Sequence, residues 1–309
     1  MREDAHFLSH GTRCAAWVYR PAAATSATST PAPATPGPAI VMAHGLGCVR
    51  DLRLPAYAER FRDAGFTVVV FDYRHFGASG GQPRQLLDIR RQLDDWRSAL
   101  AYTRSLPEVD PDRVIAWGTS FSGGHVLTLA GKGERLAGVV AQVPHVSGPA
   151  AVRATGPRAA LRLMPAILDD LWRALRRREP RYVPLVGRPG EPAAMTSPDA
   201  DPAVDRLVAA SGLRRGDMPE HVAARILARI GFYSPGRRAG RIDCPALVQI
   251  ATRDAITPAA TARRTAERIR QGRYLEYPCE HFDPYVDPHF EQVVADQLEF
   301  CLSVAGTRT

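Results

Sequence analysis

The chain has 309 residues and a formal net charge of +8, and Lys132 is its only lysine, so arginine supplies 39 of the 40 basic residues. Strong basicity usually points to nucleic acid or an anionic membrane, but these arginines are spread along the whole chain, as coding bias would place them. We therefore expect no nucleic-acid partner. We also expect one core with an insertion, because α/β folds often exceed about 250 residues as a single unit.

The five cysteines are odd in number and never occur as a Cys-x-x-Cys pair, which favours reduced thiols and no metal site. No apolar segment typical of a signal peptide follows Met1, and no run of about 18 apolar residues is present. We expect a soluble, cytoplasmic protein with no cofactor, no metal and no membrane partner. The sequence does not indicate its oligomeric state.

The first part of the chain alternates predicted strands with predicted helices. Residues 7–12 and 14–19 predict two short strands joined at Gly11, and residues 21–38, almost wholly Ala, Thr, Ser and Pro, predict a mobile surface loop. Apolar runs then predict buried strands at 39–43, 66–71, 113–117 and 136–143, and apolar periodicity predicts helices at 54–64, 86–100 and 122–130. Such alternation is typical of βαβ units and a mostly parallel sheet.

The alternation stops after Pro144. From 145 to 241 no convincing strand is visible, and two amphipathic stretches, Leu161 to Leu175 and Val222 to Ile230, flank Pro/Gly-rich sequence at 180–202. We interpret residues 145–241 as an inserted, largely helical cap. The core then comprises residues 1–144 and 242–309.

The sheet is predicted to resume after this insertion. Strands are expected at 246–251 and 274–277, separated by a helix with Thr257 as its N-cap and Pro258 as its first residue. A last amphipathic helix starts near Phe290.

The segment from Gly118 to Gly124 predicts a sharp turn from a strand into a helix, with a serine at its apex. Only small residues fit around such a strained turn, and Gly118 and Ser122 satisfy this demand around Ser120. Ser122 is an alternative centre, because Ser120 and Gly124 flank it in the same way. The apolar strand ends at Trp117, which favours Ser120 as the nucleophile.

A serine nucleophile needs a base, and the base needs an orienting acid. His281 follows the last predicted strand and Asp254 follows the strand before it, so both are expected at the same edge of the sheet. The other histidines fit structural or surface roles better, although His145 ends a strand and is expected to line the pocket. Asp72 precedes the serine in the chain and is expected to fix its own loop.

The order Ser120, Asp254, His281 is accompanied by two further motifs, His44-Gly45-Leu46-Gly47 and Asp-Tyr-Arg-x-Phe-Gly-x-Ser-Gly-Gly at 72–81. With them the chain resembles the α/β-hydrolase superfamily, and most closely the lidded bacterial serine hydrolases related to dienelactone hydrolases and X-Pro peptidases. The resemblance implies an α/β-hydrolase fold with a mostly parallel eight-stranded sheet flanked by helices. It also implies an oxyanion hole formed by the backbone N–H groups of Leu46 and Phe121.

The implied reaction is cleavage of an ester or thioester through an acyl-enzyme, with a small-molecule acyl substrate. Two alternatives remain open: a biosynthetic acyltransferase or cyclase with the same triad, and a non-catalytic binding protein on this fold. Met164, Leu168 and Trp172 are expected near the pocket or the seam between cap and core. The arginine-rich stretch at 173–181 is interpreted as a solvated helix face, with docking of an anion or a carrier protein as the alternative.

Overall fold

The computed structural model describes residues 2–22 and 36–306, so most of the loop predicted at 21–38 lies outside the described residues. Its main sheet has eight strands in the order β1-β2-β4-β3-β5-β6-β9-β10. The strands are β1 (Arg2–Ser9), β2 (Thr12–Tyr19), β3 (Gly37–Ala43), β4 (Thr67–Phe71), β5 (Val109–Thr119), β6 (Gly138–Gln142), β9 (Ala246–Ala251) and β10 (Gly272–Tyr277). Strands β1 and β2 pair antiparallel and the other six run parallel to one another, which confirms the predicted sheet.

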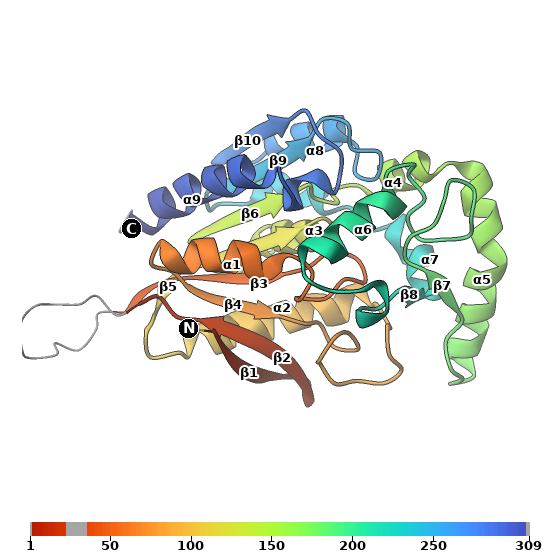
Figure 1. The fold of residues 1–309 in the computed structure, drawn as a ribbon, viewed down its shortest axis with the longest axis horizontal. Coiled ribbons are helices and arrows are strands. Elements are labelled where there is room, and N and C mark those ends of the chain that lie inside the picture. The colour runs from red at the N-terminus through yellow and green to blue at the C-terminus, as the bar shows by residue number, and fades with distance from the viewer. Residues whose placement is uncertain (1, 23–35, 307–309) are drawn as a thin grey trace, which may run out of the picture.

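Helices cover both faces of this sheet (Figure 1). One face packs against α1 (Leu54–Asp63) and α9 (Phe290–Gly306), and the other packs against α2 (Ile89–Arg104), α3 (Phe121–Ala130) and α8 (Ala259–Ala266). Successive residues of a strand therefore point to opposite faces of the sheet. Val68 and Val70 lie in the core on the face with α1 and α9, and Val69 lies in the core on the face with α2, α3 and α8. Burial on both faces explains the continuous apolar runs of the sequence.

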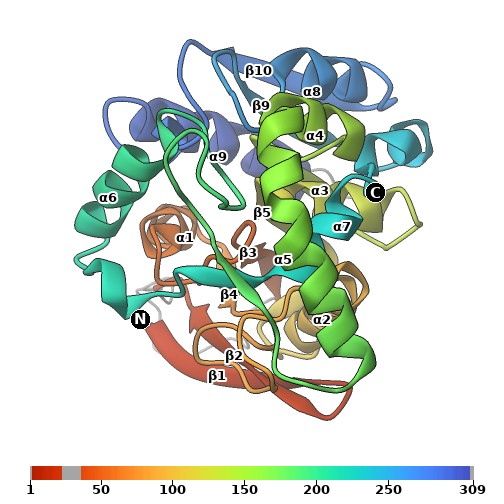
Figure 2. The same cartoon turned by 90° about the vertical axis from the view of Figure 1, so that its right-hand side faces the viewer.

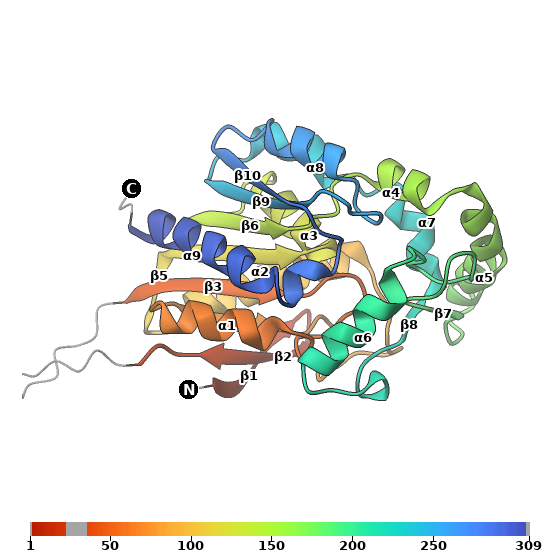
Figure 3. The same cartoon turned by 45° about the horizontal axis from the view of Figure 1, so that its top comes forward.

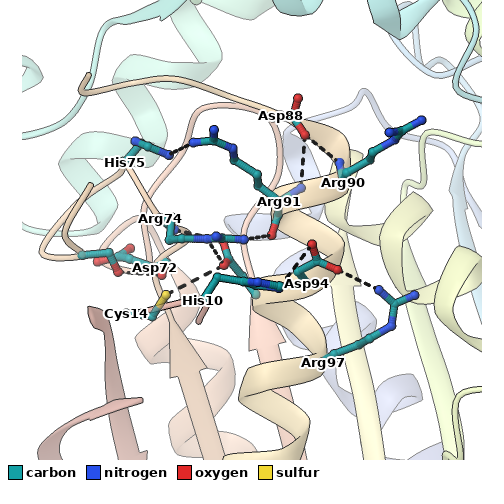
Figure 4. A network of polar contacts seen from close by, with 12 residues as sticks. His10, Cys14, Asp72, Arg74, His75, Asp88, Arg90, Arg91, Asp94 and Arg97 are labelled. Carbon is teal, nitrogen blue, oxygen red and sulfur yellow. Dashed lines mark hydrogen bonds and ion pairs between the residues drawn. The ribbon is translucent and has the colours of Figure 1, made fainter. Parts of the chain in front are cut away.

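The loop after β4 is held by buried carboxylates (Figure 4). As predicted, Asp72 fixes its own loop: it accepts a hydrogen bond from the Ala78 amide at 3.1 Å, and a Cβ on Gly77 would collide with its carboxylate. Burial raises the pKa of Asp72 to about 6. The Arg74 amide donates to the buried Asp95 at 3.0 Å, and its guanidinium donates to the same carboxylate. Tyr73 of the same loop contacts Ser122 in α3, the helix that follows β5.

Residues 145–241, here called the inserted segment, contain more than helices. They form α4 (Gly148–Thr155), α5 (Pro157–Leu175), β7 (Tyr182–Pro184), α6 (Ala200–Ala210), β8 (His221–Ala223) and α7 (Leu227–Ile230), with short 3₁₀ turns between them. Strands β7 and β8 pair antiparallel, so the prediction that this segment has no strand was wrong. The predicted second amphipathic stretch, 222–230, also divides into β8, a 3₁₀ turn and α7. Strands of three residues are too short to show a periodicity.

The inserted segment lies beyond the carboxyl ends of the parallel strands, at the opposite end of the molecule from the C-terminus (Figures 1 and 3). Helix α5 is its outermost element (Figure 2). In the part of the chain that the structure describes, no helix combines the length and apolar character needed to cross a membrane. The fold thus brings the inserted segment over the edge of the sheet where the predicted site residues lie.

Candidate active site

The turn between β5 and α3 is the predicted elbow. Ser120 stands at its apex with φ 54° and ψ −116°, a strained conformation for a residue with a side chain. A Cβ on Gly118 would collide with the carbonyl oxygen of Ser122, and one on Gly124 would collide with the carbonyl oxygen of His145. The glycines of this motif are therefore required by the close approach of the backbone.

The two candidate serines point in different directions. The Ser122 hydroxyl is buried, lies 2.7 Å from the Tyr73 hydroxyl and accepts a hydrogen bond from the Trp96 indole at 3.2 Å. The Ser120 hydroxyl lies 3.0 Å from Nε2 of His281. The geometry thus selects Ser120 as the serine beside a base, while Ser122 anchors α3 to the rest of the core.

His281 links Ser120 to Asp254. Its Nδ1 lies 2.6 Å from Oδ2 of Asp254, and both of these side chains are only 1% exposed. Asp254 follows β9 and His281 follows β10, which are adjacent parallel strands. The three residues predicted from the sequence therefore meet in one continuous hydrogen-bonded chain.

The carboxylate of Asp254 is held by the chain just after it. Its Oδ1 accepts the amides of Ile256 at 2.8 Å and Thr257 at 2.7 Å, and its Oδ2 accepts the Thr257 hydroxyl at 2.7 Å. Thr257 is not the N-cap predicted from the sequence, because α8 begins at Ala259 and Pro258 occupies the cap position. This role of Thr257 was not predicted from the sequence, although a threonine three residues after the acid is a local pattern that indicates such a hydrogen bond.

The loop after β3 passes close to Ser120. A Cβ on Gly45 would lie 2.9 Å from the Ser120 Cβ. His44 stabilises this loop, because its Nδ1 accepts the Gly45 amide at 2.8 Å and burial lowers the pKa of His44 to about 3, which keeps the ring neutral. Leu46 of this loop and Phe121, the first residue of α3, border the same space as Ser120. The amide of Phe121 has no acceptor within its own helix, as expected at a helix N-terminus.

A cavity of about 830 Å³ opens beside Ser120. Its walls come mainly from α4, α5, α7 and residues 194–198 of the inserted segment, and most of them are apolar. Met164 and Leu168 line the cavity, in the place that the sequence predicted. Arg153 is the single charged side chain among the described residues that line it. An apolar molecule of considerable size fits such a space.

Comparison with known proteins identifies the family of this chain. A family model described as serine aminopeptidase, S33, matches residues 34–278. The chain belongs to this family of α/β hydrolases. It is therefore an enzyme of the α/β-hydrolase type, whereas the narrower likeness to dienelactone hydrolases and X-Pro peptidases stays a prediction.

Three relatives are informative. The chain is 42% identical over 297 residues to the quorum-quenching protein AidA of Acinetobacter baumannii, covering 96% of this chain and 93% of the relative. It is 31% identical over 207 residues to the thiohydrolase apmlB of Arthrinium phaeospermum, covering 64% and 65% of the two chains. The crystal structure of the α/β hydrolase GrgF from Penicillium sp. sh18 matches with a TM-score of 0.79 at 21% identity, over 99% and 100% of the two chains. A polyketide transferase also named grgF, from Penicillium sp., is 29% identical over 174 residues, 55% of this chain and 57% of the relative.

Two of the predicted pocket residues in this hydrolase lie elsewhere. His145 is buried behind Phe121: its Nε2 donates to the backbone carbonyl of Tyr233 at 3.1 Å and its ring stacks on the Tyr233 ring. Burial lowers the pKa of His145 to about 4, so the ring is neutral. The backbone of His145 lies near the site, as expected for a residue that follows a strand. Its side chain, however, points toward the residues around α3 and does not line the cavity.

Trp172 was predicted near the pocket or the seam with the core, and this was wrong. It lies on the outer side of α5 and is 44% exposed. The guanidinium groups of Arg176 and Arg178 lie 4.2 and 5.2 Å from its ring centre. Leu168 and Leu171 line the cavity, and Leu171 is the last residue of α5 that does so, which places Trp172 beyond its edge.

Among the described residues, one group of side chains has metal-ligand atoms close together: Cys279, Asp283 and His289 lie with these atoms within 4.8 Å of one another. The carboxylate of Asp283 already accepts hydrogen bonds from the Glu280 amide and from Arg206. Burial also raises the pKa of Cys279 to about 12, which disfavours the thiolate that a metal requires. This donor set does not fit a metal ion.

Proposed function

We propose that this protein is a serine hydrolase that cleaves an ester or thioester of a large apolar acyl group through an acyl-enzyme. The observation that carries the proposal is the chain of hydrogen bonds from Ser120 through His281 to Asp254, with distances of 3.0 and 2.6 Å, in which Ser120 lines the apolar cavity. A hydroxyl, an imidazole and a carboxylate in this order are the parts that nucleophilic acyl transfer needs.

In the first half-reaction Nε2 of His281 takes the Ser120 proton as Oγ attacks the carbonyl carbon. The proton then passes from His281 to the leaving alcohol or thiol, and the acyl group remains on Ser120 as an ester. In the second half-reaction His281 takes a proton from water, the resulting hydroxide attacks the acyl carbon, and the proton returns to Oγ of Ser120. Asp254 holds the imidazole tautomer and stabilises its charged form throughout.

The negative oxygen of each tetrahedral intermediate is placed between the backbone amides of Leu46 and Phe121. Both residues border the cavity next to Ser120, and the Phe121 amide also lies at the positive end of α3. Backbone donors of this kind are fixed before the reaction begins. They therefore stabilise the developing charge without reorganisation.

The inserted segment acts as a cap that selects the acyl group. Its helices supply most of the cavity wall, and the volume of about 830 Å³ admits a long or bulky apolar chain. The name of the Acinetobacter baumannii relative, a quorum-quenching protein, makes an acylated signal molecule a candidate substrate for this chain. Arg153, the single charged lining residue, suits a substrate with a polar or anionic group at its outer end.

Acyl transfer to a nucleophile other than water is the second candidate, supported by the relative named as a polyketide transferase. The sequence had favoured water, because the loop at 280–285 carries polar groups. In the structure the Asp283 carboxylate is already engaged by Arg206 and by the Glu280 amide, and Phe282 and Tyr285 are buried. The polarity of this loop is thus a weaker argument for hydrolysis than the sequence suggested.

Pre-steady-state kinetics with p-nitrophenyl esters and acyl thioesters of increasing chain length test the proposal. A burst of product followed by steady turnover in plain buffer, absent in Ser120→Ala, is the expected result. A burst with almost no turnover, relieved by an added alcohol or amine that appears in the product, would show acyl transfer. No product from any ester or thioester, with or without an added nucleophile, would favour the non-catalytic alternative.

A further inference from the structure

Helix α5 carries an exposed apolar stripe. Leu161, Leu168 and Leu175 recur every seven residues and are 69%, 58% and 83% exposed. Met164 and Leu171 lie between them and are also exposed. We call these five residues the α5 stripe. Spacings of three, four, three and four residues place them along one side of a helix, which normally faces an apolar partner.

The stripe is continuous with the opening of the cavity. Met164, Leu168 and Leu171 belong to the stripe and also line the cavity, and α5 is the outermost element on this side of the molecule (Figure 2). Val152 on α4 and Phe232 after α7 are likewise both exposed and part of the cavity wall, and Phe232 is 87% exposed. The mouth of the cavity is therefore an apolar surface.

Positive charge is concentrated along α5 and in the residues just after it. Residues 157–181 include seven arginines and three acidic residues. Asp170 is fully buried against Arg225, and Asp169 is paired with Arg173, so six of the seven arginines and Glu179 lie outside these two ion pairs. The exposed Trp172 beside the stripe carries stacked guanidinium groups, and its amphipathic ring suits the boundary between lipid and water.

We propose that this face of the protein docks on an anionic lipid bilayer. Helix α5 lies in the plane of the membrane surface, with the stripe among the upper acyl chains and the arginines among the headgroups. The apolar mouth of the cavity then opens directly toward the lipid, where an apolar acyl compound concentrates. The proposal differs in this respect from the expectation, drawn from the sequence, of no membrane partner.

Two other occupants fit this face less well. In a second copy packed antiparallel along α5, Arg158 and Arg162 of one helix would approach Arg176–Arg178 of the other, and like charges repel. An acidic protein would match the charge but would also cover Phe232 and the mouth of the cavity. A bilayer satisfies the apolar and the charged parts of the face while it leaves the cavity open to apolar molecules.

Vesicle flotation tests the proposal without any catalytic readout. The full-length protein is mixed with vesicles of phosphatidylcholine alone, or of phosphatidylcholine with phosphatidylglycerol, at low and high salt. We expect binding to the anionic vesicles, weakened by salt. The triple substitution Arg176→Gln, Arg177→Gln and Arg178→Gln should weaken binding on the order of 100-fold, and the double substitution Leu161→Ser and Leu175→Ser should weaken it by about tenfold or more.

Matched controls lie outside the inserted segment. The first control replaces the exposed Arg13, Arg90 and Arg264 together by Gln, which removes the same charge as the triple test variant. The second control replaces Leu8 and Leu302, which are 66% and 50% exposed, by Ser, which removes two exposed leucines as the double test variant does. Both control variants should bind as the unchanged protein does. None of the substituted residues lines the cavity, so all variants should keep their activity on a short soluble ester.

Several outcomes would overturn docking on a bilayer. One is no binding to either vesicle, and another is equal weakening by the test and control variants. A third is a dimer of the unchanged protein that Leu161→Ser with Leu175→Ser dissociates, which would assign the stripe to a second copy. Since Ser120→Ala should bind vesicles as the unchanged protein does, failure of docking and failure of the proposed hydrolase activity are distinguished.

Discussion

The site at the edge of the sheet and the inserted segment above it are built in opposite ways. At the site, the side chains are held by specific hydrogen bonds: Asp254 accepts three from its own loop in addition to its contact with His281. In the inserted segment the cavity wall is apolar, and large apolar side chains such as Leu168 and Phe232 remain exposed. In the proposed function, the chemistry is thus confined to the loops of the core, and the choice of substrate is made by the apolar wall of the inserted segment.

The inserted segment also contains a buried polar anchor. The buried carboxylate of Asp170 accepts the amides of Arg181 at 2.8 Å and Arg225 at 2.7 Å, and it also pairs with the Arg225 guanidinium. These contacts connect α5 with the chain before β7 and after β8. The comparison therefore predicts large, specific losses for changes in the core site and smaller, substrate-dependent changes for the cavity wall.

The largest effect is expected for Ser120→Ala. Loss of the nucleophile should lower the rate of acyl transfer by roughly 10^4- to 10^6-fold, while far-ultraviolet circular dichroism and thermal unfolding stay unchanged. Ser122→Ala is the matched control: it should keep activity within about tenfold but lower the free energy of unfolding by about 1–3 kcal/mol, because the buried Tyr73 and Trp96 groups lose a partner. A reversed pattern between the two serines would show that the elbow is centred on Ser122.

Asp254→Asn should cost somewhat less, about 10^3- to 10^4-fold in kcat/KM. The amide can no longer favour the tautomer of His281 that leaves Nε2 free to accept the Ser120 proton. Thr257→Val, which removes only the hydroxyl that Oδ2 of Asp254 accepts, should lower kcat/KM by about tenfold. If Asp254→Asn kept full activity across pH, the acid would have to be sought elsewhere, and Asp283 would be the next residue to replace.

The buried His145 should make stability depend on pH. Burial lowers its pKa from 6.5 to about 4. At a pH between these two values, this imidazole therefore binds a proton in the unfolded chain but not in the folded protein. The free energy of unfolding should therefore fall as pH falls through this window, by about 3 kcal/mol once pH is below 4. Urea unfolding of His145→Gln between pH 7 and pH 4 should show a flatter slope. His6→Gln, at an exposed position, should leave the slope unchanged; a flattening as large as that for His145→Gln would refute the assignment.

The smallest effect is expected at the cavity wall. Leu168→Trp adds bulk beside the acyl group, so it should lower kcat/KM for long-chain esters by about tenfold, while the value for an acetyl ester changes little. Trp172→Ala is the neighbouring control, because Trp172 does not line the cavity. A panel of p-nitrophenyl esters measures both. If chain-length preference changed in neither variant, the inserted segment would not select the acyl group.

Most of the core was predictable from the sequence because its signals are local. A strand buried on both faces, such as 66–71, reads as an unbroken apolar run, and the turns of this fold place Ser120, Asp254 and His281 directly after strands. The separation of the chain into strands and helices before residue 144 therefore needed no knowledge of distant contacts.

The inserted segment was harder because its structure depends on contacts between distant residues. The pattern from Leu161 to Leu175 marked an apolar helix correctly, but it did not say which part of the helix faces the cavity and which faces outward, so Trp172 was misplaced. His145 was misplaced for the same reason, since its direction is fixed by Tyr233, 88 residues away. The pairing of β7 with β8 likewise joins segments that are separated by α6.

The central claim is that one serine at the elbow forms the covalent intermediate. Treatment with a fluorophosphonate, followed by proteolysis and mass spectrometry, locates the modified residue directly. We predict a single adduct on Ser120 that is lost in Ser120→Ala, strongly reduced in His281→Ala and retained in Ser122→Ala. An adduct on Ser122, or labelling that persists in Ser120→Ala, would contradict the claim.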